Sequence, residues 1–254
     1  MDPLALPPNV EERLRDASHV VAFSGAGLSA ESGLGTFRGA DGLWKQFRPE
    51  DLASPEGFAR HPSRVWDWYL SRYRAIAAAE PNPGHRAIAS WAPRFPSLTI
   101  VTQNIDGLHQ RAGSDEVLEL HGSLLRARCS RCDRPLPMAD VVGWPGSPPA
   151  CDDCGGKLRP DVVWFGEILP EEVLAAAIAA TEEAELFVAV GTSATVYPAA
   201  GLIELAYRQR ALVIEVNPEE TSLSSLAGLC LRGPAGQELP RLTEAIERCR
   251  SAPD

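Results

Sequence analysis

Short runs made mostly of apolar residues recur along the chain and alternate with segments whose apolar positions repeat at helical spacing. An apolar run of four to six residues that is bounded by polar residues or glycine is typical of a strand buried on both faces. We expect such strands at residues 19–23, 98–102, 117–120, 186–190 and 212–216.

Helices are expected between most of these strands. Proline at the first helical position loses no backbone hydrogen bond, and three prolines each precede a segment of helical periodicity. We therefore expect a first helix over 9–17 and three further helices, at 171–180 after Pro170, 199–210 after Pro198 and 241–250 after Pro240. This alternation predicts an α/β protein with a doubly wound, Rossmann-like parallel sheet.

Two segments interrupt the alternation. Residues 40–80 are helical in pattern and rich in tryptophan, and residues 125–160 carry four of the six cysteines. We interpret both segments as insertions that together form a smaller domain. The larger, Rossmann-like domain is then discontinuous and comprises residues 1–39, 81–124 and 161–254.

A glycine-rich loop, residues 24–38, directly follows the first expected strand. Its Gly25-x-Gly27-x-x-Ala30 pattern fits the dinucleotide fingerprint, because glycine lets the backbone approach a pyrophosphate and a helix from about Ser29 would point its free N–H groups at that charge. The alternative is an ordinary strand-to-helix corner. In a dehydrogenase the pattern continues through a helix to an acidic residue about 20 positions on. Here glycines and prolines interrupt that continuation, which argues against an ordinary dehydrogenase.

Polar side chains follow the ends of two further expected strands. Gln103, Asn104 and Asp106 follow one strand, and His121 follows the next. Ligands of doubly wound proteins bind at this edge of the sheet, so the three polar residues are candidates for bonds to ribose or an amide. The alternative is that Asn104 or Asp106 caps a helix. His121 is a candidate general base, since histidine titrates near neutral pH.

The cysteines form two close pairs, Cys129-x-x-Cys132 and Cys151-x-x-Cys154, with 18 residues between them. This is the spacing of a tetrahedral zinc site, whereas disulfides are the competing interpretation. A chain without a signal peptide stays in a reducing compartment, which favours zinc. Four sulfur ligands leave no position for water, so the predicted metal is structural.

The composition limits the kinds of binding partner that we expect. The chain has 254 residues, is 44% apolar and carries a net charge of −10, which suits a sizeable core and argues against direct nucleic-acid binding. The N-terminus lacks the features of a signal peptide, and the longest apolar run, 173–180, is too short to cross a bilayer. We expect a soluble cytoplasmic protein without membrane contact.

Taken together, these motifs resemble the sirtuins, and they occur in that family's order from Val20 to about Leu242. The motifs are Gly-Ala-Gly-Leu-Ser-Ala-Glu-Ser-Gly with Thr36-Phe37-Arg38, Gln103-Asn104-Ile105-Asp106, His121-Gly122, the two cysteine pairs and Gly191-Thr192-Ser193. The resemblance implies NAD as a co-substrate, consumed in a cleft between a Rossmann-like domain and a zinc-ribbon domain. It also implies removal of acyl groups from protein lysines, with His121 as base and Asn104 and Asp106 as further catalytic residues, and we expect a monomer.

The resemblance also assigns cofactor contacts residue by residue. The implied NAD-binding residues are Gly25, Ala26, Gly27, Ala30, Thr36, Phe37, Arg38, Trp44, Gln103, Asn104, Ile105, Asp106, Gly191, Thr192, Ser193, Asn217, Pro218, Glu219 and Ala235. Asn217 is implied to contact the adenosine ribose and Ala235 the adenine side. Ser24 and Gly35 depart from the residues common in the family, but neither is a reacting group.

Substrate contacts follow from the same resemblance. The segment Val162, Val163, Trp164, Phe165, Gly166, Glu167 resembles the strand to which an extended peptide adds by backbone pairing, while its alternative is an ordinary buried strand. Tyr69 and Arg72 lie three residues apart on one helix face, and with Ala53 they resemble the acyl pocket that accepts carboxylated chains.

We therefore expect desuccinylation and demalonylation to exceed deacetylation. The alternatives are an enzyme that is chiefly a lysine deacetylase, a mono-ADP-ribosyltransferase that uses the same NAD cleft, or a catalytically silent NAD-binding module.

Overall fold

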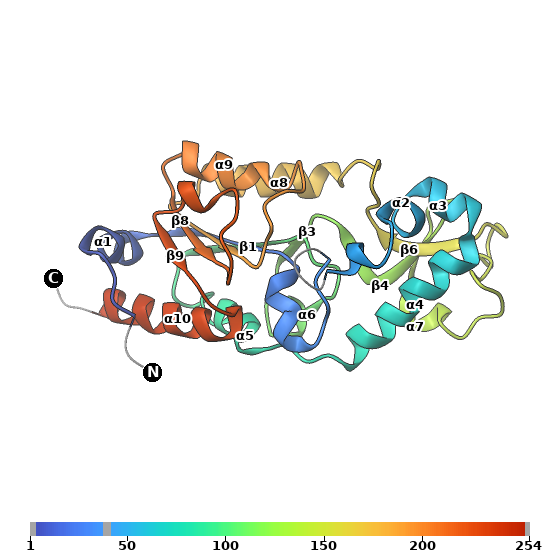
Figure 1. Cartoon of the computed structure of the whole chain (residues 1–254), viewed down its shortest axis with the longest axis horizontal. Coiled ribbons are helices and arrows are strands. Elements are labelled where there is room, and N and C mark those ends of the chain that lie inside the picture. Colours follow the sequence, from blue (N-terminus) through green and yellow to red (C-terminus); the bar gives the residue numbers. More distant parts are fainter. Residues whose placement is uncertain (1–3, 38–41, 252–254) are drawn as a thin grey trace.

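The computed structural model describes residues 4–37 and 42–251. Its larger sheet has six strands in the order β3-β2-β1-β7-β8-β9, and every neighbouring pair is parallel (Figure 1). The strands are β1 (His19–Ser24), β2 (Ser97–Thr102), β3 (Val117–Glu119), β7 (Leu186–Val190), β8 (Leu212–Val216) and β9 (Leu229–Leu231). The doubly wound α/β fold is confirmed, and β9, which has only three residues, is the strand that the sequence pattern did not predict.

Helices cover both faces of this sheet, which is why its strands are almost wholly apolar. One face packs on α1 (Pro8–Asp16), α5 (Pro83–Ala89) and α10 (Ala235–Ser251), and the other on α8 (Glu171–Glu182) and α9 (Gly201–Arg208) (Figure 1). Successive strand residues point to opposite faces.

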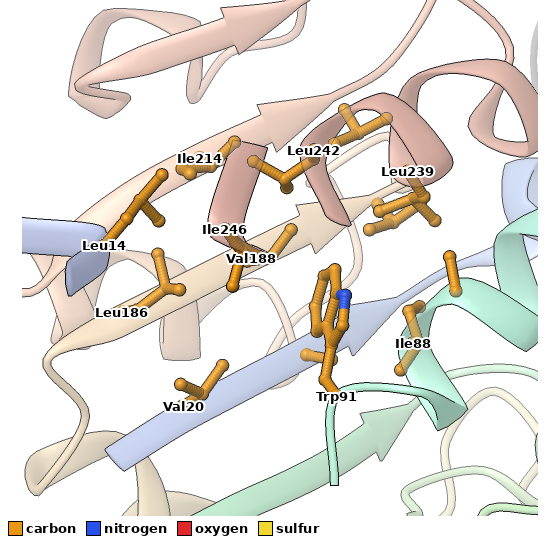
Figure 2. Close-up of a cluster of buried hydrophobic side chains, with 14 of the residues drawn as sticks. Leu14, Val20, Ile88, Trp91, Leu186, Val188, Ile214, Leu239, Leu242 and Ile246 are labelled. Atoms are coloured by element: carbon orange, nitrogen blue, oxygen red, sulfur yellow. The ribbon is translucent and has the colours of Figure 1, made fainter. Parts of the chain in front are cut away.

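Figure 2 shows the first of these two cores, where Trp91 lies between the sheet and α10 near Ile88 and Leu242. Trp91 is fully buried, and its indole Nε1 donates a hydrogen bond to Thr243 of α10 at 2.8 Å. Truncating a buried tryptophan to alanine costs about 3–5 kcal/mol, so Trp91 strongly joins the segment after α5 to α10.

Two predicted helix starts are wrong. The last helix begins at Ala235, and Pro240 lies inside it. Proline there removes the bond to the Gly236 carbonyl, but the first turn is held by buried Leu239 and by the Gly236 amide, which donates to the Glu31 carboxylate. The glycine-rich loop forms a 3₁₀ helix, η1 (Ala26–Ser32), instead of an α-helix from Ser29.

The second sheet has three antiparallel strands in the order β5-β4-β6, namely β4 (Gly122–Cys129), β5 (Pro135–Pro137) and β6 (Leu158–Val162). It shares one core with the helical segment, which contains η2 (Leu43–Lys45), α2 (Pro49–Leu52), α3 (Pro55–Arg60) and α4 (Pro62–Ala78), and with α7 (Met138–Val141). This shared core supports one small domain built from both insertions, while the domain boundaries stay a prediction.

The remaining short elements are α6 (Leu108–Arg111) and η3 (Ser224–Leu226). The shared core of the small domain lies at one end of the elongated molecule, and α1 lies at the other (Figure 1). None of the described helices is both long enough and apolar enough to cross a membrane.

Candidate functional site

The glycine-rich loop after β1 and the Gly191-Thr192-Ser193 turn after β7 touch each other where the strand order reverses between these two strands. The Gly27 amide donates to the Gly191 carbonyl at 2.8 Å. A Cβ on Gly27 would lie 2.7 Å from the Gly191 Cα, and a Cβ on Gly191 would lie 2.3 Å from the Leu28 nitrogen. Gly191 also has a φ of +57°. Both positions therefore require glycine, and together they leave room for a ligand at the carboxyl edge of the sheet.

Polar side chains that follow three of the strands, β2, β7 and β8, connect the strand ends at this edge of the sheet. Gln103 donates to the Thr192 hydroxyl at 3.0 Å, and Asn217 donates to the Thr192 carbonyl at 2.9 Å. The Asn104 amide donates to the Gly25 carbonyl at 3.1 Å and is 6% exposed. Residues that are far apart in the sequence thus form one polar floor beneath the glycine loop.

The Asp106 carboxylate lies under η1. It accepts bonds from the Ser29 hydroxyl at 2.7 Å and from the Leu108 amide at 2.9 Å. The second bond is a local turn from Asp106 to the first residue of α6, whose N-cap is Gly107, so the interpretation of Asp106 as a helix cap is wrong. Burial raises the pKa of Asp106 above its ordinary value, and the Ser29 bond offsets part of that rise.

The His121 ring is oriented by the backbone carbonyl of Gln103. Its Nδ1 lies 2.9 Å from the Gln103 carbonyl, and because a carbonyl only accepts, Nδ1 carries the proton. The other nitrogen, Nε2, is then the basic one in the neutral ring. Burial lowers the pKa of His121 below its ordinary value, against the opposite effect of the Gln103 carbonyl. The side chain is therefore neutral, and able to take up a proton, at neutral pH.

A cleft of about 650 Å³, called the main cleft below, lies between the larger sheet and the small domain. Among the described residues, no lysine or arginine lines it. The expected site residues that line it are Gly25, Ala26, Gly27, Thr36, Phe37, Trp44, Ala53, Tyr69, Gln103, Asn104, Ile105, His121, Val162, Trp164, Phe165, Gly166, Glu167, Gly191, Thr192, Ser193, Asn217 and Glu219. The structure therefore brings most of the predicted residues to one cleft.

A second, small cavity of about 20 Å³ adjoins the main cleft, and Phe37, Asn104 and Ile105 line both. Arg72 and Asp106 line only the small cavity. Ala30, Pro218 and Ala235 line neither, and Arg38 lies outside the described residues.

Tyr69 and Arg72 share a face of α4 as predicted, but they differ in their surroundings. Tyr69 is 4% exposed, and its hydroxyl oxygen accepts a bond from Trp164 Nε1 at 3.0 Å. The Arg72 guanidinium lies 4.8 Å from the ring centroid of Phe37 and 5.3 Å from that of Trp68. Its Nε is buried and has no hydrogen-bond partner in the described part of the chain. Burial lowers the pKa of Arg72 from its ordinary value and raises that of Tyr69.

Only Val162 of the predicted substrate segment, residues 162–167, lies in a strand, because β6 ends there. The following residues turn, with Gly166 at a φ of +89°, and the Glu167 carboxylate folds back to accept a bond from the Trp164 amide at 2.8 Å. The interpretation of the whole segment as a buried strand is therefore wrong. Phe165 remains 43% exposed at the cleft mouth.

Two buried histidines beneath the glycine loop were not singled out from the sequence. His109 Nε2 lies 2.8 Å from the Ser24 hydroxyl, and His85 Nδ1 accepts a bond from the Asn82 amide at 3.3 Å. Their ring centroids are 5.3 Å apart. Burial, together with the nearby His109, lowers the pKa of His85 to about 3, and burial lowers that of His109 to about 4.

Other residues of the main cleft were also missed, among them Thr195, Val196 and Tyr197. They directly follow the Gly191-Thr192-Ser193 turn, so their position after a strand end was the signal that could have indicated them. Ser29, in the small cavity, lies within the glycine-rich motif itself.

The four cysteines converge at the end of β4. The sulfur atoms of Cys129, Cys132, Cys151 and Cys154 all lie within 4.8 Å of one another. Zinc–sulfur bonds of 2.3 Å would place tetrahedral ligands about 3.8 Å apart, so the arrangement fits a zinc ion. Backbone amides of residues 131 and 156 point at two of the sulfurs, as suits thiolates. These four residues fit a structural zinc site, and Cys129 lies at the opposite end of β4 from His121, which directly precedes that strand.

Comparison with known proteins agrees with this geometry. The Sir2 family model matches residues 25–198. The chain is 52% identical over 232 residues to an NAD-dependent protein deacylase of Mycobacterium tuberculosis, a match that covers 89% of this chain and 97% of the relative. A Sir2 homologue solved in complex with NAD is 42% identical, with a TM-score of 0.89, and the match covers 99% of this chain and 98% of that one. A Sir2 complex with a p53 peptide and NAD+ is 32% identical, with a TM-score of 0.85 and coverage of 93% and 97%. The chain belongs to the Sir2 family.

Proposed function

We propose that this protein is an NAD-dependent deacylase of protein lysine side chains, with nicotinamide, O-acyl-ADP-ribose and free lysine as products. The relatives that carry this activity in their names match almost the whole chain. The single observation that carries the proposal is His121, which lines the cleft that the glycine turns border and whose Nε2 is the basic nitrogen of the neutral ring.

In this proposal the acyl-lysine carbonyl oxygen attacks C1′ of the nicotinamide ribose, and nicotinamide leaves. The product of this step is an alkylimidate that links the lysine to ADP-ribose. His121 then takes a proton from a ribose hydroxyl, so that this oxygen can attack the resulting imidate carbon. The Gln103 carbonyl keeps the proton of neutral His121 on Nδ1. Water finally releases lysine and the acylated ADP-ribose.

NAD would lie along the carboxyl edge of the larger sheet. Gly25, Gly27 and Gly191 give it backbone access, and Asn217 lies at the end of β8, where the adenosine ribose is expected. The zinc site takes no part in the chemistry, because four sulfur ligands leave no open coordination position. Its role is to hold β4 and the segment after it.

We further propose that succinyl and malonyl groups are preferred to acetyl. A carboxylate at the end of the acyl chain would bind the Tyr69 hydroxyl and the Arg72 guanidinium, and the small side chain of Ala53 would leave space for it. Arg72 supports this role because its buried Nε lacks a hydrogen-bond partner among the described residues.

One observation favours plain deacetylation as a second candidate. Arg72 faces the small cavity and not the main cleft, so its guanidinium must turn past Phe37 to meet an acyl carboxylate.

The test is a side-by-side measurement of kcat/KM on acetyl, malonyl and succinyl versions of one peptide, with and without NAD, followed by mass spectrometry. The proposal predicts NAD-dependent loss of the acyl group, fastest for the acidic chains. Turnover without NAD, or none on any peptide, would refute deacylation. Equal or faster turnover of the acetyl peptide would leave deacylation standing and reject only the selectivity.

A further inference from the structure

Trp164 determines the direction of the hydrogen bond that it shares with the Tyr69 hydroxyl. Trp164 Nε1 donates to the Tyr69 oxygen at 3.0 Å, and the two residues are 2% and 4% exposed. An indole N–H can only donate, so the tyrosine oxygen is the acceptor in this pair. The tyrosine proton must therefore point elsewhere.

Within residues 4–37 and 42–251, the structure gives that proton no acceptor. Tyr69 and Trp164 both line the main cleft. The Tyr69 hydroxyl can therefore donate its proton to a ligand in this cleft. An ionised carboxylate only accepts hydrogen bonds, so it suits this donor. An acetyl group ends in a methyl and gains nothing from this proton.

The indole is itself held on several sides. The Arg159 guanidinium lies 3.4 Å from the indole ring centroid, and the Phe58 ring lies 5.3 Å away on a neighbouring helix. Arg159 also donates to both oxygens of Glu167, at 2.5 and 2.9 Å, and Glu167 accepts from the Trp164 amide. Because backbone and ring are both fixed, the indole N–H keeps its direction toward Tyr69.

From this arrangement we propose that Trp164 is a specificity-determining positioning residue: it fixes the Tyr69 hydroxyl as a donor and so selects acyl groups that end in a carboxylate. The inference rests on the proposed deacylase function and extends it to a residue that acts through Tyr69.

The test is a double-mutant cycle with Trp164→Phe, Tyr69→Phe and the double variant, assayed on succinyl and acetyl peptides. A neutral hydrogen bond corresponds to about a fivefold effect, so Trp164→Phe should lower the ratio of the succinyl to the acetyl kcat/KM about fivefold, through KM for the succinyl peptide. In the Tyr69→Phe background the same substitution should have no further effect. Phe58→Leu, which disturbs the packing of the indole but not its bond, is the matched control and should affect both peptides alike.

An equal loss on both peptides, or the same loss with and without the Tyr69 hydroxyl, would overturn the proposal. Should Trp164→Phe fail to fold, replacement of Trp164 by its benzothiophene analogue, which lacks only the N–H, gives the same readout. If the wild-type enzyme does not prefer the succinyl peptide, the proposed selectivity itself is rejected. If the wild-type enzyme does prefer it and Trp164→Phe keeps that preference, only the role of Trp164 is rejected.

Discussion

The buried pair His85 and His109 should make the protein sensitive to mild acid. Both rings are at most 1% exposed and lie under the loop that borders the main cleft. Asn82 donates to Nδ1 of His85, and Ser24, which donates its own proton to Thr102, accepts from Nε2 of His109. Each ring is therefore neutral in the fold, and protonation would place two charges 5.3 Å apart, measured between the ring centroids.

The direction in which stability changes with pH follows from the pKa values of the two histidines. Burial lowers the pKa of His85 to about 3 and of His109 to about 4, below the ordinary 6.5. Below pH 6.5 the unfolded chain binds protons that the fold does not, so stability is present above this pH and is lost as the pH falls toward the folded values. The loss is about 1.4 kcal/mol per pH unit for each histidine, or about 4 kcal/mol for the pair between pH 7 and 5. That is a large part of a typical unfolding free energy of about 5–15 kcal/mol.

Urea unfolding at pH 7 and pH 5 measures this loss. The variant His85→Gln/His109→Gln should be less stable at pH 7 but should lose about 4 kcal/mol less between the two pH values. Asp106, whose raised pKa acts in the opposite direction, is present in both proteins and cancels in the comparison. His61→Gln, at an exposed histidine, is the matched control and should leave the loss unchanged. An equal loss in wild type and double variant would refute the reasoning.

Three further predictions concern the base, the metal and the glycine turns. His121→Asn should lower kcat for deacylation by about 10²- to 10⁴-fold while calorimetry shows NAD affinity nearly unchanged; near-normal turnover would remove this residue from the mechanism. Elemental analysis should find one zinc per chain, and Cys129→Ser should reduce soluble, folded protein more than specific chemistry, whereas metal-free protein with a disulfide under reducing conditions would contradict the zinc site. Gly191→Ala should weaken NAD binding at least about tenfold, because the added Cβ would lie 2.3 Å from backbone at a φ of +57°. Gly143→Ala, which meets nothing within 4 Å, is its control, and equal NAD affinity in the two variants would contradict the argument.

The sheet was predictable because both of its faces are covered, which makes the strands continuous apolar runs. β7 and β8 lie at the predicted residues. β3 and β9 both have three residues, but the apolar pattern of β3 continues to Leu120, whereas that of β9 ends at Arg232, and only β3 was predicted. Pro240 misled the prediction of the last helix, since a contact from Glu31, distant in the sequence, stabilises the turn before it. A local pattern contains no information about such a partner.

Some features of the site were also predictable from local sequence, whereas others depend on residues that are distant in the chain. The zinc ligands and the glycine turns were readable because their geometry fixes the residue type and the spacing locally. The Trp164–Tyr69 bond joins residues 95 positions apart, and the direction of Arg72 depends on its packing against Phe37 and Trp68. Both depend on tertiary packing, which only the assembled structure contains.

The central claim, an NAD-dependent deacylase whose pocket binds an acyl carboxylate, is tested most directly by Arg72→Met. Methionine keeps much of the packing against Phe37 and Trp68 but removes the charge. A charge-assisted hydrogen bond is worth about 1.5–3 kcal/mol, so kcat/KM for the succinyl peptide should fall about 10- to 100-fold, through KM, while the acetyl peptide is nearly unchanged. An equal loss on both peptides, or a loss on neither, would contradict the carboxylate-binding role of Arg72 and leave plain deacetylation as the function of the cleft.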